Sequence, residues 1–96
     1  MVSDELELLV REYVKLGRSS SRGFHPVECP MCNDYKARGG FLFTNGSIGW
    51  NCFNCGYTTR FDDTHGRPSK KFISLLNGFG IPEDSVKAIL MRNLAS

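Results

Sequence analysis

Four cysteines stand in two closely spaced pairs, Cys29 with Cys32 in CPMC and Cys52 with Cys55 in CFNC. The spacing C-x2-C, nineteen residues, C-x2-C lies within the interval typical of zinc sites. Two cysteines separated by two residues in a tight turn can direct both sulfurs at one ion, and a second such turn completes a tetrahedron. We therefore expect the four thiolates to bind one Zn2+ in a closed, structural site.

Two other uses of the cysteines stay open at this stage, namely a pair of disulfides and a dithiol redox site. The N-terminal stretch MVSDELELLVREY lacks the basic start and apolar segment of a secretory signal, so we expect a reducing compartment, which disfavours disulfides. An iron–sulfur cluster has no supporting feature. His25 and His65 could also bind a metal, but with four thiolates at hand we interpret them as surface or packing residues.

The segment between the cysteine pairs has the pattern of a β-hairpin. Residues 41–52 alternate with period two around Asn45 and Gly46, the preferred dipeptide of a type I′ turn. Counting outward from this turn pairs Phe41 with Trp50 and sorts the side chains onto two faces. One face consists of Phe41, Phe43, Ile48 and Trp50, and the other of Leu42, Thr44, Ser47, Gly49 and Asn51. Because the first face is uniformly apolar, we interpret Trp50 as buried rather than as a base-stacking residue.

A helix is expected before the cysteines. Residues 4–16 carry apolar side chains at spacings of three and four, with Ser3 as a candidate N-cap and Gly17 as a stop. Such a stripe favours packing on the core of the protein, and a partner-binding helix is the alternative.

Two shorter helices are expected after the cysteines. Residues 69–77 have Ser69 as a cap and Gly78 as a stop, and their apolar residues repeat at helical spacing. A further helix restarts near Pro82, followed by acidic residues that suit the positive end of a helix.

These elements predict a small α+β zinc ribbon. Strands near 57–61 and 24–28 would extend the hairpin to a three- to four-stranded antiparallel sheet. We divide the chain into an N-terminal helix at 1–17, a zinc ribbon at 18–66 and a C-terminal helical segment at 67–96. Together they would form one compact domain.

Composition places the chain among small globular domains. Its 96 residues are near the lower limit for a core that is stable without a cross-link or a metal. Hydrophobic residues make up 41%, and no apolar run approaches the roughly 18 residues of a membrane span. We expect a soluble, cytoplasmic protein with no membrane partner. Between residues 18 and 71, eight basic side chains outnumber four acidic ones, an excess that favours an anionic partner.

Two segments around the cysteines, CPMCNDYKARGGFLF and GWNCFNCGY, resemble a known family. A proline follows the first ligand, a basic and small-residue stretch leads into an aromatic strand, and CFNCG closes the site. These features are similar to the N-terminal zinc-binding domain of bacterial and phage DNA primases. Many bacterial primases have a histidine as second ligand where this chain has Cys32, so the four-cysteine phage version is the nearer likeness. A phage-encoded protein would act in the cytoplasm of the bacterial host cell.

The resemblance implies a module that helps select the start site on single-stranded template DNA and assists primer initiation. In that family a separate polymerase domain makes the primer, so we expect no enzymatic activity here and interpret Asp62 and Asp63 as a solvated turn. The polymerase domain or a replicative helicase would be the protein partner. Single-strand binding needs cations for phosphates, and aromatic and polar side chains for bases. The expected DNA contacts are Tyr35, Lys36, Arg38, Asn51, Tyr57 and Arg60.

A zinc ribbon can also serve as a protein-interaction module that docks on replication or transcription machinery. The acidic helix at 4–16 and the near-zero net charge expected once four thiolates bind zinc favour this alternative. A redox enzyme would instead need a metal-free thiol of lowered pKa. Because DNA binding through several cations weakens steeply with ionic strength, a salt titration separates the first two hypotheses.

Overall fold

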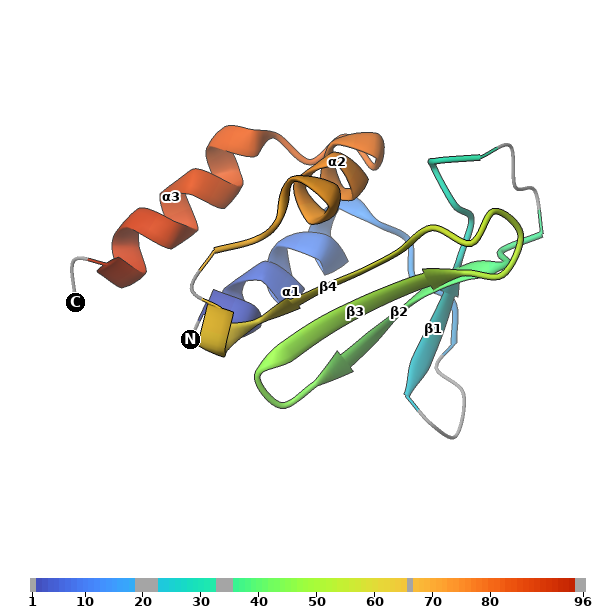
Figure 1. Cartoon of the computed structure of the whole chain (residues 1–96), viewed down its shortest axis with the longest axis horizontal. Coiled ribbons are helices and arrows are strands. Elements are labelled where there is room, and N and C mark those ends of the chain that lie inside the picture. Colours follow the sequence, from blue (N-terminus) through green and yellow to red (C-terminus); the bar gives the residue numbers. More distant parts are fainter. Residues whose placement is uncertain (1, 19–22, 33–35, 66, 95–96) are drawn as a thin grey trace.

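The computed structural model describes residues 2–18, 23–32, 36–65 and 67–94, and it is an α+β fold (Figure 1). The elements, in chain order, are α1 (Val2–Tyr13), β1 (Phe24–Val27), β2 (Gly39–Thr44), β3 (Ser47–Cys52), β4 (Thr58–Asp62), the 3-10 turn η1 (Asp63–His65), α2 (Lys70–Gly78) and α3 (Glu83–Leu94). The expected N-terminal helix, antiparallel sheet and two C-terminal helices are therefore confirmed.

The sheet is antiparallel, with strand order β1-β2-β3-β4. The hairpin of β2 and β3 has the expected register, with Phe41 paired to Trp50. Gly46 has a φ of 87°, the left-handed conformation that its position in a type I′ turn requires. The strands expected at 24–28 and 57–61 are present as β1, which ends one residue earlier, and β4, which is displaced by one residue at both ends.

The start of α1 differs from the prediction, since the helix begins at residue 2 rather than 4. Ser3 is therefore not the N-cap but lies in the first turn. Its backbone N–H and its hydroxyl both donate to the carboxylate of Asp63, at 2.9 and 2.7 Å. Asp63, in η1, thus satisfies donors at the start of α1 and places a negative charge at the positive end of that helix. The interpretation of Asp63 as part of a solvated turn is wrong.

The end of α1 also differs, because the helix stops at residue 13 rather than 16. The backbone N–H of Gly17 donates to the carbonyl of Pro26 at 2.9 Å. Residues 14–16 therefore leave the helix to bring the chain alongside β1. Glycine permits this contact, because an added Cβ at position 17 would lie 2.7 Å from the Pro26 carbonyl oxygen.

The second helix, α2, begins as expected and ends later. The Ser69 hydroxyl accepts a hydrogen bond from the N–H of Phe72 at 3.2 Å, which confirms the N-cap. Gly78 is not the stop, because α2 includes it and is capped by Phe79. A side chain at Gly78 would come within 3.1 Å of Pro30, so this glycine lets the helix approach the first cysteine pair. The third helix, α3, starts just after Pro82.

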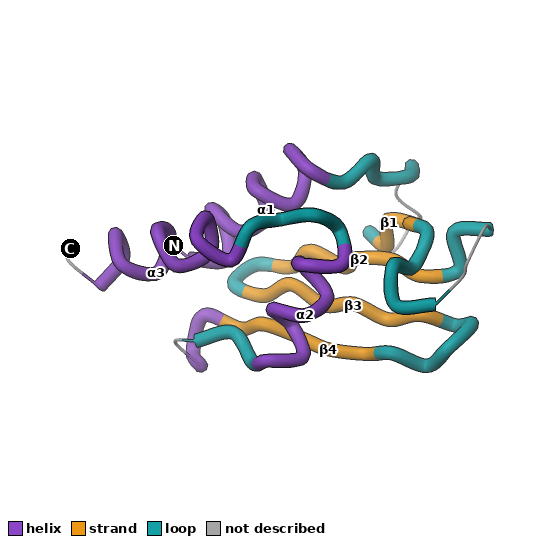
Figure 2. Tube along the Cα trace, turned by 90° about the horizontal axis from the view of Figure 1, so that it is seen from above, coloured by secondary structure: helices purple, strands orange, loops and turns teal. Residues whose placement is uncertain are grey.

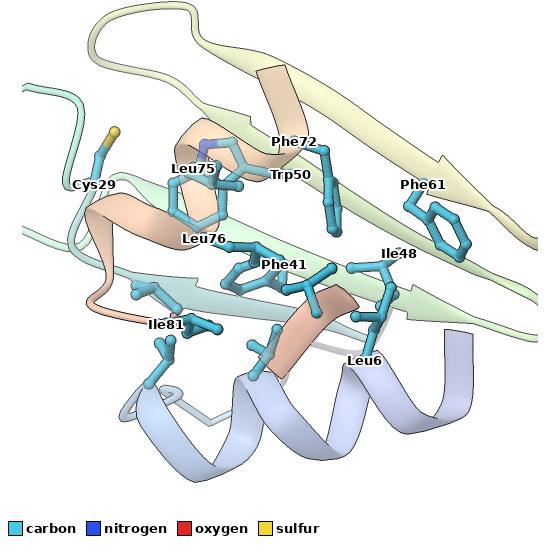
Figure 3. Packing of buried hydrophobic residues seen from close by; sticks show 14 of the residues in the cluster. Leu6, Cys29, Phe41, Ile48, Trp50, Phe61, Phe72, Leu75, Leu76 and Ile81 are labelled. Carbon is cyan, nitrogen blue, oxygen red and sulfur yellow. The ribbon is translucent and has the colours of Figure 1, made fainter. Parts of the chain in front are cut away.

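The hydrophobic core lies between the sheet and the helices (Figure 3). Trp50 is 2% exposed, and its ring packs edge-on against Phe41, with ring centroids 4.8 Å apart. The ring of Phe79, after α2, closes over both from 5.5 and 5.6 Å. The expectation that Trp50 is buried is confirmed. The largest fully buried side chains are Phe41, Phe61, Phe72, Leu6, Ile48, Leu75, Leu76 and Ile81.

The helices cover only one side of the sheet. Figures 1 and 2 agree that α1 and α2 lie on the same side, and α3 extends past the sheet alongside α1. The opposite side of the sheet, which we call the open face, is covered by none of the described helices. Within the described part of the chain, no helix has the length and apolar character needed to cross a membrane.

Candidate metal centre and open sheet face

The four cysteine sulfurs converge at one end of the sheet. All lie within 4.8 Å of one another, with Cys29 to Cys55 and Cys32 to Cys52 both at 3.9 Å. A tetrahedral zinc with Zn–S bonds of about 2.3 Å would hold its sulfurs about 3.8 Å apart. The four cysteines are free thiols rather than disulfides. Donor type, number and spacing therefore fit a single tetrahedral metal site.

Local backbone geometry explains how the second cysteine pair forms. Cys52 ends β3, and the chain turns back so that the N–H of Gly56 donates to the carbonyl of Cys52 at 2.9 Å. Gly56 has a φ of 77°, as the sequence predicts for the position after the last ligand. The N–H of Cys52 in turn donates to Tyr57 at 3.0 Å, which leads directly into β4. The turn therefore holds two sulfurs while the sheet continues.

Burial and backbone donors set the four thiols apart. Cys29 is buried, and loss of hydration raises its pKa to about 12. Burial alone would also raise the pKa of Cys52, but the N–H groups of Cys55 and Asn54 stabilise its thiolate and bring the pKa down to about 7. Cys55 is exposed, which leaves one corner of the site open to solvent.

An amide and a guanidinium support the second ligand, Cys32. The Asn54 side-chain NH2 donates to the sulfur of Cys32 at 3.3 Å, and Arg38 donates to the Asn54 oxygen at 2.7 Å. Hydrogen bonds of this kind orient a ligand and stabilise a thiolate. Sequence reasoning assigned Arg38 to DNA and overlooked Asn54, although its place between two ligands brings it near the sulfurs.

The open face carries an unusual set of side chains for a surface. Across the strands, Phe24 pairs with Leu42, Leu42 with Gly49, and Gly49 with Arg60. Phe53, between the last two cysteines, is 73% exposed, and its ring centroid lies 5.9 Å from that of Phe24. These residues, with Gly40, Asn51 and Thr58, line a shallow cleft of about 300 Å3.

The predicted DNA contacts are distributed unevenly. Asn51 and Arg60 line the cleft, and Lys36 is exposed. Tyr57 lies towards α2, where its hydroxyl donates to the carbonyl of Lys71 at 2.7 Å. Burial and the nearby Cys29 raise the pKa of the Tyr57 hydroxyl. Tyr35 lies outside the described residues, and its contact with DNA stays a prediction, as do the others.

Phe24 and Leu42 complete the cleft but were not among the predicted contacts. The hairpin register already placed Leu42 on the same face as Asn51, so its exposure could have been anticipated. Phe24 arrives there only through the pairing of β1 with β2. Phe53 could have been recognised from its place between two ligands, since a tight metal-binding turn leaves little room to bury a ring.

His25 takes no part in the cysteine cluster. His25 Nδ1 lies 3.2 Å from the carbonyl oxygen of Gly17, and its ring packs 5.6 Å from that of Phe43. Its interpretation as a packing residue is confirmed. The side chain of His65 lies outside what the structure describes.

A second hollow lies among the helices, on the other side of the molecule. This helical groove has a volume of about 880 Å3 and is lined by α3, by the start of α1 and by residues before and within α2. Its apolar lining includes Ile73, Val86 and Leu90, and Met91 beside it is 69% exposed. Arg67 and Lys87 stand at its rim with Glu83.

Comparison with known proteins returns no relative of this chain. No family model matches it, and neither a curated protein nor a solved structure does. The metal centre, the open face and the helical groove are therefore the observations from which a function can be inferred.

Proposed function

We propose that this chain is a non-catalytic module, held by one structural Zn2+, that binds single-stranded template DNA for primer initiation. The open face is the observation that supports this function most strongly. It combines an exposed aromatic ring, Phe53, with a second ring, Phe24, and a cation, Arg60, on a surface that none of the described helices covers. Single-strand binding proteins use this combination, because bases stack on rings while cations follow the phosphates.

Zinc is the metal that the ligand set favours. Four thiolates at tetrahedral spacing suit Zn2+, and a site with four protein ligands has no open position for a substrate. Bound zinc would fix the turn that carries Phe53 relative to the strand that carries Asn51. The metal would thus support DNA binding indirectly, by holding the residues of the open face in position.

Unpaired bases suit this surface better than a duplex does. Stacking on Phe53 requires the flat face of a base, which is accessible only when the strand is unpaired. Arg60 lies on the open face and Lys36 is exposed, so both cations are available to contact phosphates of the strand. Arg38 contributes charge near the metal while its side chain holds Asn54.

The acidic pair at the end of β4 supports a role without catalysis. Asp63 accepts two hydrogen bonds from Ser3, and Asp62 accepts from Thr64 and lies 3.5 Å from Arg60. Both carboxylates therefore have structural partners. In this proposal the primer is made by a polymerase domain, and the present chain presents the template to it.

The helical groove favours a second candidate function, protein docking. An apolar hollow of about 880 Å3 among the three helices, beside the exposed Met91, suits an apolar segment of another protein. The primase polymerase domain or a replicative helicase would be such a partner. The two functions use opposite sides of the molecule and are compatible.

A salt titration tests the proposed function. Zinc-loaded protein is titrated into fluorescein-labelled single-stranded and duplex octamers, and binding is followed by anisotropy from 20 to about 200 mM salt. With Lys36, Arg38 and Arg60 on phosphates, log K should fall against log[salt] with a slope of about −2 for the single strand. The duplex should bind more weakly. Absence of single-strand binding at the lowest salt would contradict the proposal and leave protein docking as the better explanation.

A further inference from the structure

Two of the three glycines inside the strands have a clear packing reason. An added Cβ at Gly39 would lie 2.5 Å from the ring of Trp50. At Gly40 it would lie 2.2 Å from the ring of Phe24. Real Cβ atoms do not approach other atoms this closely, so these glycines let two aromatic rings lie on the sheet.

Gly49 has no such reason. Its φ is not in the positive region, and the nearest atoms to an added Cβ are the carbonyl oxygen and Cβ of Leu42, at 3.8 and 4.0 Å. These are ordinary contact distances, so the fold would accept a side chain here. Glycine within a strand weakens it, because it costs more backbone entropy and packs nothing. A strand glycine that the fold does not require often marks the close approach of a ligand.

The side chains on either side of Gly49 leave a gap above it, which we call the seat. Leu42 lies opposite it on β2 and is 37% exposed, while Arg60 lies opposite it on β4. The Arg60 guanidinium reaches back across β3 to the Ser47 hydroxyl at 3.3 Å and is also held by Asp62. Arg60 lies opposite Gly49 on β4, and its side chain is 65% exposed, so the guanidinium is accessible beside the gap. A guanidinium plane held in this way can stack on a flat ring.

Asn51 can form hydrogen bonds with the edge of a base. It lies two residues along β3 on the same face, lines the same cleft and is half-buried. Among the described residues, none makes a hydrogen bond with its side chain that accounts for this placement. Its amide offers a donor and an acceptor side by side, which match the edge of a nucleobase.

We propose that the cleft above Gly49 seats one unpaired base of the DNA strand, between Leu42 and the Arg60 guanidinium, with Asn51 on the edge of the base. This inference rests on the proposed function and deepens it, because it makes Gly49 and Asn51 the specificity-determining positions. Phe53 and Phe24 stack bases of any identity, whereas the site above Gly49 distinguishes one base from another.

The first test fills the seat. Gly49→Val and Gly49→Ala, both zinc-loaded, are compared with wild type for binding to labelled dA8, dC8 and dT8. Valine should raise the thermal midpoint, since it suits a strand, and should weaken binding roughly tenfold, the loss expected for one stacked base. Alanine should raise the thermal midpoint less and weaken binding less than valine does. Leu8→Ala, on the exposed side of α1 and away from the cleft, should bind within about twofold of wild type.

The second test changes Asn51. Its outcome separates an error in the proposed base site from an error in the proposed DNA-binding function. Asn51→Asp leaves only acceptors, so binding to dC8 and dA8, whose bases carry an amino group, should gain at least about fivefold relative to dT8. The proposed base site would be overturned if Asn51→Asp keeps the wild-type ratios of affinity for dA8, dC8 and dT8 and Gly49→Val keeps full affinity. This holds even if Phe53→Ala abolishes binding. If wild type binds no octamer, the seat and the proposed function fail together.

Discussion

The two faces of the same four strands follow different rules. On the face under the helices, most large side chains are buried and their size is explained by their neighbours, as for Phe41 against Trp50 and Phe79. On the open face, Phe53 is exposed and Gly49 is smaller than its space allows. Folding therefore explains one face and leaves the other unexplained. Residues that stability does not require are the best indicators of what this protein binds.

The metal centre lies where the two faces meet, and its loss should have the largest effect. Removing zinc with a chelator, or the Cys52→Ser substitution, should unfold the cysteine turns and the adjoining strands, since structural zinc sites contribute about 10 kcal/mol or more in small domains. The measurement is the dispersion of the hairpin amide resonances by NMR. Re-addition of Zn2+ should restore it in wild type but not in the variant. Retained dispersion without metal would show that the core alone supports the sheet.

Truncation on the covered face should come next in size. Phe41→Ala removes a fully buried ring from between Trp50 and Phe79 and should lower the free energy of unfolding by about 3–5 kcal/mol. Urea denaturation of the zinc-loaded protein gives this value. If the variant remains folded in buffer, its DNA affinity should be close to that of wild type. A large and specific loss of affinity would contradict the assignment of stability to the covered face and binding to the open face.

Truncation on the open face should show the opposite pattern. Phe53→Ala should leave the free energy of unfolding within about 0.5 kcal/mol and weaken single-strand binding by about 1–3 kcal/mol. Leu8→Ala is a matched control, because Leu8 on α1 is 68% exposed, close to the 73% of Phe53. Anisotropy and urea denaturation on the same samples test both quantities. Equal affinities for the two variants would remove Phe53 from the binding surface.

The smallest expected effect comes from the contact that joins the sheet to α1. Asp63→Ala removes two hydrogen bonds to Ser3 and the charge at the helix start, and should cost about 1 kcal/mol of stability. Thermal denaturation followed by circular dichroism measures this loss. DNA binding should not change, because Asp63 takes no part in the cleft. An unchanged midpoint would mean that water replaces the carboxylate at little cost.

Local patterns predicted the parts of the fold that local chemistry determines. The hairpin register follows from the Asn45–Gly46 turn and the period of two, and the cysteine cluster follows from spacing alone. The limits of α1 were missed because Asp63 and Pro26, distant in sequence, set them. The direction of Tyr57 towards α2 likewise depends on the packing of that helix.

The candidate site was predicted in part for the same reason. Asn51 and Arg60 could be placed on one face from strand alternation, and both line the cleft. Phe24 was missed because its position depends on which strand pairs with β2. The significance of Gly49 could not be seen without coordinates, because only the space around it distinguishes it from Gly39 and Gly40.

The pairing of the first and last helices has a practical consequence. Glu5 on α1 lies 3.2 Å from Arg92 on α3, so the chain enters and leaves at the same pole of the molecule. The loops that carry the cysteines lie at the opposite pole (Figure 1). A surface anchor or fluorophore joined at either end would therefore lie away from the metal site and on the helical side of the sheet rather than on the open face. Immobilised binding assays can be built on this polarity without obstructing the surface under test.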